Sequence, residues 1–307
     1  MKFKNILYFI ISIFFFASCV EDISLPLENG TKMLVVEGGL TTDAISHKIM
    51  LSLTNDFYDT ERPAAVSGAT VTLSDGENTY TLTETGTAGT YRTPVFAAEI
   101  GKTYRLEISD VNIDGTEKYW AEASIDYQIS PLDSIKISNI KRIDTIYNKD
   151  KTIKKTDTIY YVNRENYLPL FIFLKDQKEV RNFYLGKVAV NDTLLNDTIS
   201  RYFYTDDMLF NGSYVNDNIV SVYRFKTKLT GERDDYRILR PNSKVTVYAY
   251  GISKDYYYFI SDINSTGSAN PFMGPPTPPR SNIFPAGKAC GFFYAMSSTQ
   301  YSMIYLP

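Results

Sequence analysis

Short runs of alternating apolar and polar residues recur along the chain, and they constrain its fold more than any other feature. Residues 49–53, 69–73 and 104–108 each carry apolar side chains at every second position. In an extended strand such positions share one face, so each run predicts a strand with one buried face. Turn residues such as Asp75 and Gly76 separate the runs, at the spacing of roughly 8 to 12 residues that is typical of an antiparallel β-sandwich.

Aromatic residues are abundant and support this interpretation. The chain has 25 Tyr and 18 Phe, and aromatic and β-branched residues favour strands. Two explanations stay open. The rings can fill the cores of β-sandwiches, or they can form a surface that binds sugars or peptides.

The first domain is predicted to span residues 31–130 as a single sandwich. It has no pair of cysteines to link its two sheets, which favours an immunoglobulin-like or transthyretin-like sandwich over an antibody-type domain. The segment 66–73, followed by Gly89-Thr90-Tyr91, resembles transthyretin-like and carboxypeptidase regulatory-like modules.

Residues 131–307 are predicted to form a second β-rich domain, which begins at Pro131-Leu132-Asp133. The segments 143–147 and 156–160 echo each other and predict a long hairpin, with the lysine-rich segment 149–155 as its solvated tip. Further strands are expected at 168–174, 183–190, 244–250 and 292–306, and an extended loop at 270–285.

One short helix is expected in this second domain, over residues 253–263. Ser253 can cap its first turn, Asp255 suits the positive end of the helix, and apolar side chains recur at helical spacing from Tyr256 to Ile263. The predicted fold class is therefore mainly β, with an N-terminal sandwich, a second β-rich domain and one short helix.

The N-terminus has the pattern of a lipoprotein signal. Two lysines within residues 1–4 precede an apolar run from Ile6 to Phe16, and small residues lead to Cys19. The run is shorter than the roughly 20 residues that span a bilayer. We expect residues 1–18 to be removed, Cys19 to be lipidated, and residues 19–30 to form a tether between the membrane anchor and the first domain.

The charge balance argues against nucleic-acid binding. The full chain has a net charge of −3, and loss of Lys2 and Lys4 with the signal takes it to −5. Nucleic-acid binding depends on basic contacts to phosphates. With Cys19 lipidated, Cys290 is the only other cysteine, so no intramolecular disulfide is expected.

A search for catalytic motifs finds none, so no enzymatic activity, cofactor or metal site is expected. The single histidine, His47, is interpreted as a solvated residue at the end of a strand. No Gly-x-Ser-x-Gly segment supplies a nucleophile. One His and one free Cys are too few for a structural zinc site. The acidic segments 110–114, 206–207 and 234–235 do not match the spacing of a calcium loop.

Several short segments, in this order, make the chain resemble the Bacteroidota lipoproteins of domain of unknown function 4249. They are Cys19-Val20-Glu21-Asp22 and the segments 34–38, 131–135, 182–184, 209–212, 252–257, 270–272 and 281–283. The resemblance implies an outer-membrane lipoprotein, anchored through its lipid and encoded beside TonB-dependent transporters. The expected function is a non-enzymatic accessory or ligand-binding partner of such a transporter, with an unknown ligand. The alternative is a structural or assembly lipoprotein of the envelope.

Two further expectations follow from that lineage. Acidic residues close behind the lipidated cysteine serve there as a surface-export signal, which Glu21 and Asp22 fit, so the protein is expected to face the cell surface; a plain periplasmic tether is the alternative. The lineage also O-glycosylates Ser or Thr that follows Asp and precedes a small or aliphatic residue. Five residues match this pattern, although strand alternation also produces it: Ser134, Thr145, Thr158, Thr193 and Thr198.

Overall fold

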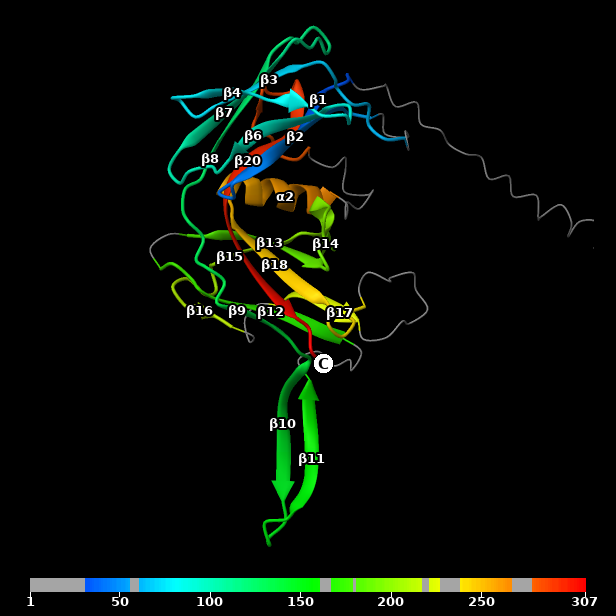
Figure 1. The fold of residues 1–307 in the computed structure, drawn as a ribbon, viewed down its shortest axis with the longest axis vertical. Helices are drawn as coiled ribbons and strands as arrows, with labels where there is room; N and C mark the ends of the chain where they lie inside the picture. The colour runs from blue at the N-terminus through cyan, green and yellow to red at the C-terminus, as the bar shows by residue number, and fades with distance from the viewer. Residues whose placement is uncertain are drawn as a thin grey trace, which may run out of the picture. The chain divides into compact units, whose positions relative to one another are not determined.

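Two β-sandwiches share one large sheet, and the chain is mainly β as the alternating pattern predicts (Figure 1). The computed structural model describes residues 31–55, 61–160, 167–178, 181–216, 221–226, 238–266 and 278–307. From Lys32 onward these residues belong to one compact unit. Among them, no helix is long and apolar enough to cross a membrane.

The first sandwich encloses a core contributed by both of its sheets. Val36 and Leu51 from one sheet pack with Leu73 and Leu106 from the other, and all four are fully buried. One sheet contains β1 (Leu34–Thr41), β2 (Ile45–Leu53), β6 (Thr90–Phe96) and β5 (Thr83–Glu84). The other contains β19 (Ile283–Phe284), β8 (Tyr119–Ser124), β7 (Thr103–Ser109), β3 (Thr70–Ser74) and β4 (Thr79–Thr81).

The second sandwich is built in the same way. Leu170 and Ile172 from its smaller sheet pack against Val188 and Val247 from the large sheet. The large sheet here contains β13 (Phe183–Val190), β18 (Lys244–Gly251), β14 (Thr193–Leu194) and β15 (Phe203–Asp206). The smaller sheet contains β9 (Ser134–Ile137), β12 (Tyr167–Lys175), β16 (Tyr214–Val215) and β17 (Ser221–Lys226).

A single long strand, β20 (Ala289–Ile304), belongs to both sandwiches (Figure 1). Its first half pairs with β1 in parallel, with Gly39 opposite Tyr294. Its second half pairs with β18 in antiparallel orientation, with Val247 opposite Tyr301. The core of the first sandwich therefore includes Phe293 from near the end of the chain. The chain passes from the first sandwich to the second near residue 131, where the boundary was expected. It later returns to the first sandwich, which also contains β19 and the first half of β20.

The helix α2 (Lys254–Thr266) covers the outer face of the large sheet. The Ser253 hydroxyl accepts a hydrogen bond of 3.2 Å from the N–H of Tyr256, so the predicted capping residue and helix start are confirmed. Phe259 and Ile260 pack on Phe292 of β20 and on β13. A short 3₁₀ turn, η1 (Ile199–Arg201), lies beside α2.

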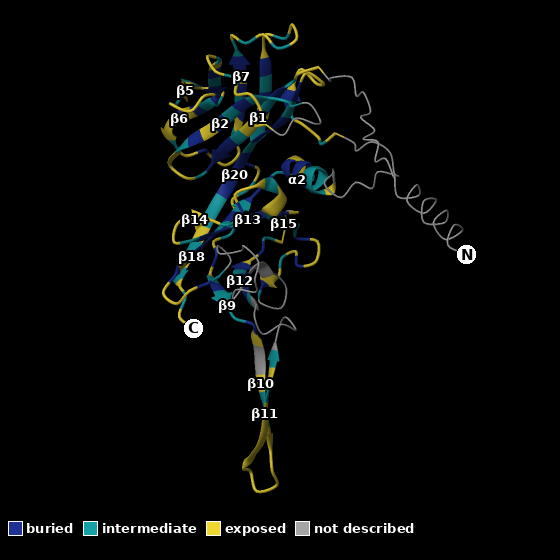
Figure 2. Cartoon of the chain, turned by 90° about the vertical axis from the view of Figure 1, so that its right-hand side faces the viewer, coloured by how far each residue is buried: buried dark blue, intermediate teal, exposed yellow. Residues whose placement is uncertain are grey.

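The predicted hairpin is also present, as β10 (Ile140–Tyr147) and β11 (Ile153–Tyr160). These strands pair only with each other among the described strands. Ile143 and Ile153 are exposed, and the residues of the turn are exposed as well (Figure 2). The lysine-rich segment forms a solvated tip as expected.

Candidate functional site

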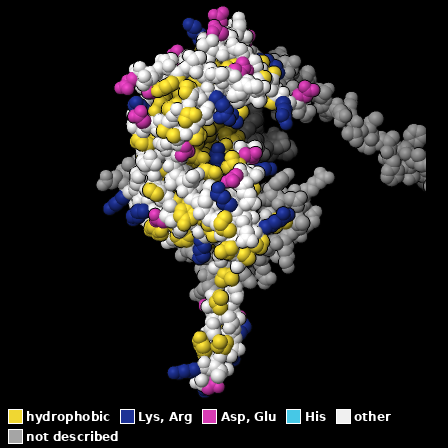
Figure 3. All heavy atoms as spheres, in the orientation of Figure 1, with side chains coloured by type: hydrophobic (Ala, Val, Ile, Leu, Met, Phe, Trp, Pro, Cys, Tyr) yellow, Lys and Arg dark blue, Asp and Glu magenta, His cyan; other side chains and the backbone are white. Residues whose placement is uncertain are grey.

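An open cleft of about 910 Å³ lies on the outer face of the large sheet. Figure 3 shows a hollow in this face in which hydrophobic side chains gather, with basic and acidic side chains around it. We call it the aromatic cleft. Its lining comes from β1, β2, β13, β14, η1, β18, α2 and β20, together with Arg92 of β6.

Strand alternation explains which side chains reach the aromatic cleft. Along the first half of β20, Phe293 and Ala295 point into the core of the first sandwich. The residues that alternate with them, Phe292, Tyr294 and Met296, therefore point to the opposite face, where they line the cleft. This half of β20 is apolar on both faces because α2 covers the face that the sandwich leaves open.

The aromatic side chains of the cleft contact one another across β20 and α2. The rings of Tyr256 and Tyr294 stack with their centroids 4.7 Å apart. The centroid of the Phe292 ring lies 5.2 Å from that of Tyr256 and 5.1 Å from that of Phe259. Offset and tilted pairs at such distances are stabilising, so one wall of the cleft is a packed aromatic surface.

Lys187 of β13 brings a positive charge to the lining of the cleft. Its Nζ lies 4.5 Å from the centroid of the Tyr202 ring and 5.9 Å from that of Tyr250. Burial, together with repulsion by Lys48, lowers the pKa of Lys187 to about 8, while attraction by Asp197 opposes this shift. The ammonium is thus held mainly by aromatic faces, and it lies nearer to deprotonation than an ordinary lysine.

Further charged side chains line the aromatic cleft without pairing. Lys48, Glu37 and Asp197 form no ion pair within 4 Å among the described residues, and neither does Lys187. Arg92 donates a hydrogen bond from Nη1 to the carbonyl oxygen of Ser46. The cleft therefore carries three cations against two anions, and their charges are available to a bound molecule.

His47 corrects one expectation, because it is not a solvated residue at the end of a strand. It lies within β2 and is only 3% exposed. Its Nε2–H donates to the carbonyl oxygen of Phe96 at 3.0 Å, and its ring meets that of Phe96 edge to face. Burial lowers the pKa of His47, so its neutral form is favoured. His47 lies where the pairing of β2 with β6 shifts register, between Ser46 and Lys48. This irregularity cannot be read from the sequence, so the burial of His47 was not predicted.

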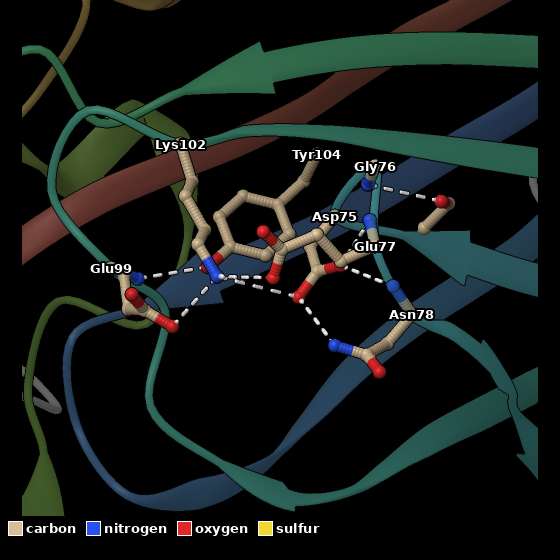
Figure 4. Close-up of polar contacts among 8 residues, drawn as sticks. Asp75, Gly76, Glu77, Asn78, Glu99, Lys102 and Tyr104 are labelled. Atoms are coloured by element: carbon tan, nitrogen blue, oxygen red, sulfur yellow. Dashed lines mark hydrogen bonds and ion pairs between the residues drawn. The ribbon is translucent and has the colours of Figure 1, made fainter.

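A second polar cluster surrounds Lys102 in the first sandwich (Figure 4). Its ammonium lies 3.0 Å from a carboxylate oxygen of Glu99, 3.7 Å from Asp75 and 3.9 Å from Glu77. Asp75 also accepts the backbone N–H groups of the turn, which lowers its pKa. The cluster stabilises the predicted turn at Asp75-Gly76. Within the described ranges, no group of three or more His, Cys, Asp or Glu side chains is arranged to hold a metal ion.

The residues predicted from the sequence as sites have separate locations. Cys19, Glu21 and Asp22 lie outside the described residues. Among the proposed glycosylation sites, Thr145 and Thr158 lie on the hairpin and Ser134 on β9, while Thr193 lies on β14 and Thr198 precedes η1. Thr158, Thr193 and Thr198 are exposed, and Thr198 lines the aromatic cleft.

The cleft itself was not predicted from the sequence. Its lining residues come from segments far apart along the chain, so no local motif marks it. The dense aromatic segments at 256–259 and 292–294 were the available signal. The first explanation of the aromatic content holds for Tyr91 and Tyr104, which fill a core, while other rings line the cleft.

Comparison with known proteins gives a single family. The family model described as Domain of unknown function (DUF4249) matches residues 20–302, which confirms the resemblance inferred from the short segments. No curated protein matches the chain.

Proposed function

The chain belongs to the family of domain of unknown function 4249, and from this premise we propose that it is a non-enzymatic, ligand-binding lipoprotein of the outer membrane. In this proposal Cys19 carries the lipid and Glu21 and Asp22 direct the protein to the cell surface. The protein works there as the accessory of a TonB-dependent transporter. The aromatic cleft is where it holds its ligand.

The observation that carries the ligand-binding part is the size and lining of the cleft. A volume of about 910 Å³ falls in the range of small-molecule sites, which are roughly 300–1,000 Å³. Such sites combine an apolar and aromatic lining with a few polar groups. Here Tyr256 and Phe292 supply the first, and Lys187 and Glu37 the second.

Membrane attachment can be tested at Cys19. A Cys19→Ser variant is expected to lose the lipid and to leave the membrane fraction, whereas the wild type incorporates labelled palmitate and stays in it. Stable anchoring takes at least two acyl chains, and a protein without Cys19 would carry none there. A variant that remains membrane-bound would therefore contradict the proposed anchor.

Ligand binding and the transporter partnership can be tested together by affinity purification from native membranes. The wild type is expected to retain a transporter, and a small molecule that denaturation releases and mass spectrometry detects. The variant that tests the cleft is Ser200→Trp, in which a large side chain replaces an exposed residue of the cleft lining. This variant should fold but release no small molecule. Recovery of the wild type with neither partner would favour the alternative of a structural or assembly lipoprotein.

A further inference from the structure

We propose that the aromatic cleft selects organic anions, with the anionic group at Lys187 and an apolar or ring-shaped body against the aromatic wall. This inference rests on the proposed ligand-binding function and names the class of ligand. It follows from three features of the cleft: an uncompensated ammonium, a surplus of positive charge, and tyrosine hydroxyls without partners.

The ammonium of Lys187 is in an unusual position for a lysine. Lys187 is half-buried, and lysine side chains withdrawn from water are usually paired, yet Lys187 has no ion pair or hydrogen bond among the described residues. Its contacts are the faces of Tyr202 and Tyr250. Aromatic faces stabilise a cation without neutralising it, so the charge stays available to an anion that enters the cleft.

The surrounding charges favour an anion over a cation. Lys48 of β2 faces Lys187 closely enough to lower its pKa, and Arg92 adds a third positive charge to the lining. Asp197 and Glu37 carry the opposing negative charges, but among the described residues neither forms an ion pair with any of the three. A carboxylate or sulfonate beside Lys187 would relieve the repulsion by Lys48 and offset the cost of burying the ammonium.

Four tyrosine hydroxyls offer hydrogen bonds to the same ligand. Tyr202, Tyr250, Tyr256 and Tyr294 line the cleft, and their hydroxyls have no hydrogen-bond partner among the described residues. Burial raises the pKa of each, so all four stay protonated donors at neutral pH. The one fully buried side-chain oxygen or nitrogen without a partner in the described part of the chain is Oδ1 of Asp207. The four hydroxyls therefore keep contact with the open cleft.

The test uses two fluorescent probes with the same ring system. One is 8-anilinonaphthalene-1-sulfonate, and the other is N-phenyl-1-naphthylamine, which lacks the sulfonate. In Lys187→Met the affinity for the sulfonate is expected to fall at least about tenfold, while the neutral probe binds as it does to the wild type. Lys118→Met, which removes an exposed lysine away from the cleft, should leave both affinities unchanged.

The pH dependence gives an independent measurement that does not rely on removing the side chain. Since Lys187 loses its proton as the pH rises through about 8, the wild type should bind the sulfonate more weakly at pH 10 than at pH 7. Lys187→Arg keeps its charge and should bind the sulfonate equally at both. The groups that face Lys187 are Lys48, Asp197, Tyr202 and Tyr250, and Lys187→Arg, which keeps all four, reports any effect that they have on the pH dependence.

The outcomes separate this inference from the function on which it rests. If both probes bind equally to the wild type and Lys187→Met changes neither affinity, the selection of anions is wrong while the cleft still binds ligands. If the probes do not bind, or if Ser200→Trp binds them as tightly as the wild type, the cleft is not a ligand site. Circular dichroism and thermal melting establish that each variant is folded.

Discussion

The hydroxyl of Ser297 accepts a hydrogen bond of 2.9 Å from the backbone N–H of Ile129. Ser297 is fully buried at the point where β20 changes partners, since Met296 pairs with β1 and Ser297 with β18. Ile129 belongs to the segment that leads from the first sandwich to the second. One buried side chain thus joins the shared strand to the connection between the sandwiches.

Replacement of Ser297 by Ala should destabilise the protein measurably. The buried N–H of Ile129 would lose its acceptor, and an unsatisfied buried donor costs roughly 1–3 kcal/mol. Denaturant unfolding should show a lower midpoint with an unchanged slope. Gln300→Ala, at an exposed position of the same strand, should stay within about 0.5 kcal/mol of the wild type. Equal midpoints for the two variants would show that this bond contributes nothing.

The first sandwich should not fold without the C-terminal strands. A fragment of residues 31–130 lacks β19 and β20, so β1 loses one neighbour and the core loses Phe293. We expect this fragment to give a poorly dispersed NMR spectrum, and addition of a peptide of residues 281–297 to restore dispersion. A cooperative unfolding transition of the fragment alone would contradict the prediction.

The protonation of His47 should make stability depend on pH. Because burial lowers its pKa below the ordinary histidine value of about 6.5, the unfolded chain binds more protons than the folded one just below that pH. The free energy of unfolding should therefore fall as the pH drops from 6.5 through the folded pKa, by at most about 1.4 kcal/mol per pH unit. In His47→Gln this part of the slope should disappear. Parallel curves for the two proteins between pH 7 and pH 5 would show that His47 does not titrate on unfolding.

Gly39 is required by the close approach of β1 to β20. A Cβ at this position would lie 2.0 Å from the carbonyl oxygen of Tyr294 and 2.4 Å from its ring. Gly39→Ala should therefore cost roughly 1–3 kcal/mol, as overpacking does, and should displace Tyr294 in the aromatic cleft. Weaker binding of the fluorescent probes would report the displacement. Gly86→Ala is the control, since a Cβ there meets nothing within 4 Å; a loss of stability equal to that of Gly39→Ala would contradict this reason.

Local patterns predicted the local elements well. The strands at 49–53, 104–108 and 183–190, the hairpin and the capped start of α2 all follow from side-chain periodicity and capping chemistry, which depend on neighbouring residues. Residues 283–284 were expected in an extended loop but pair with β8 as β19. Such pairing depends on distant partners, which periodicity does not reveal.

The same limit explains why the candidate site was missed. The two partners of β20 lie far from it in sequence, and the cleft exists only once that strand has joined β1 to β18. The sequence could show that aromatic residues were abundant. It could not show that Tyr91 faces a core while Tyr294 faces a cleft, because that division depends on which face α2 covers.

The double membership of β20 also sets an order of events during synthesis. Among the described strands, β20 leaves the ribosome after all the others, yet it lies in the interior of the large sheet. Until it emerges, β1 and β18 remain open edges, and neither sandwich can close around its core. Contacts as distant in sequence as Gly39 and Tyr294 also form slowly. The growing chain therefore stays incompletely folded until β20 is made.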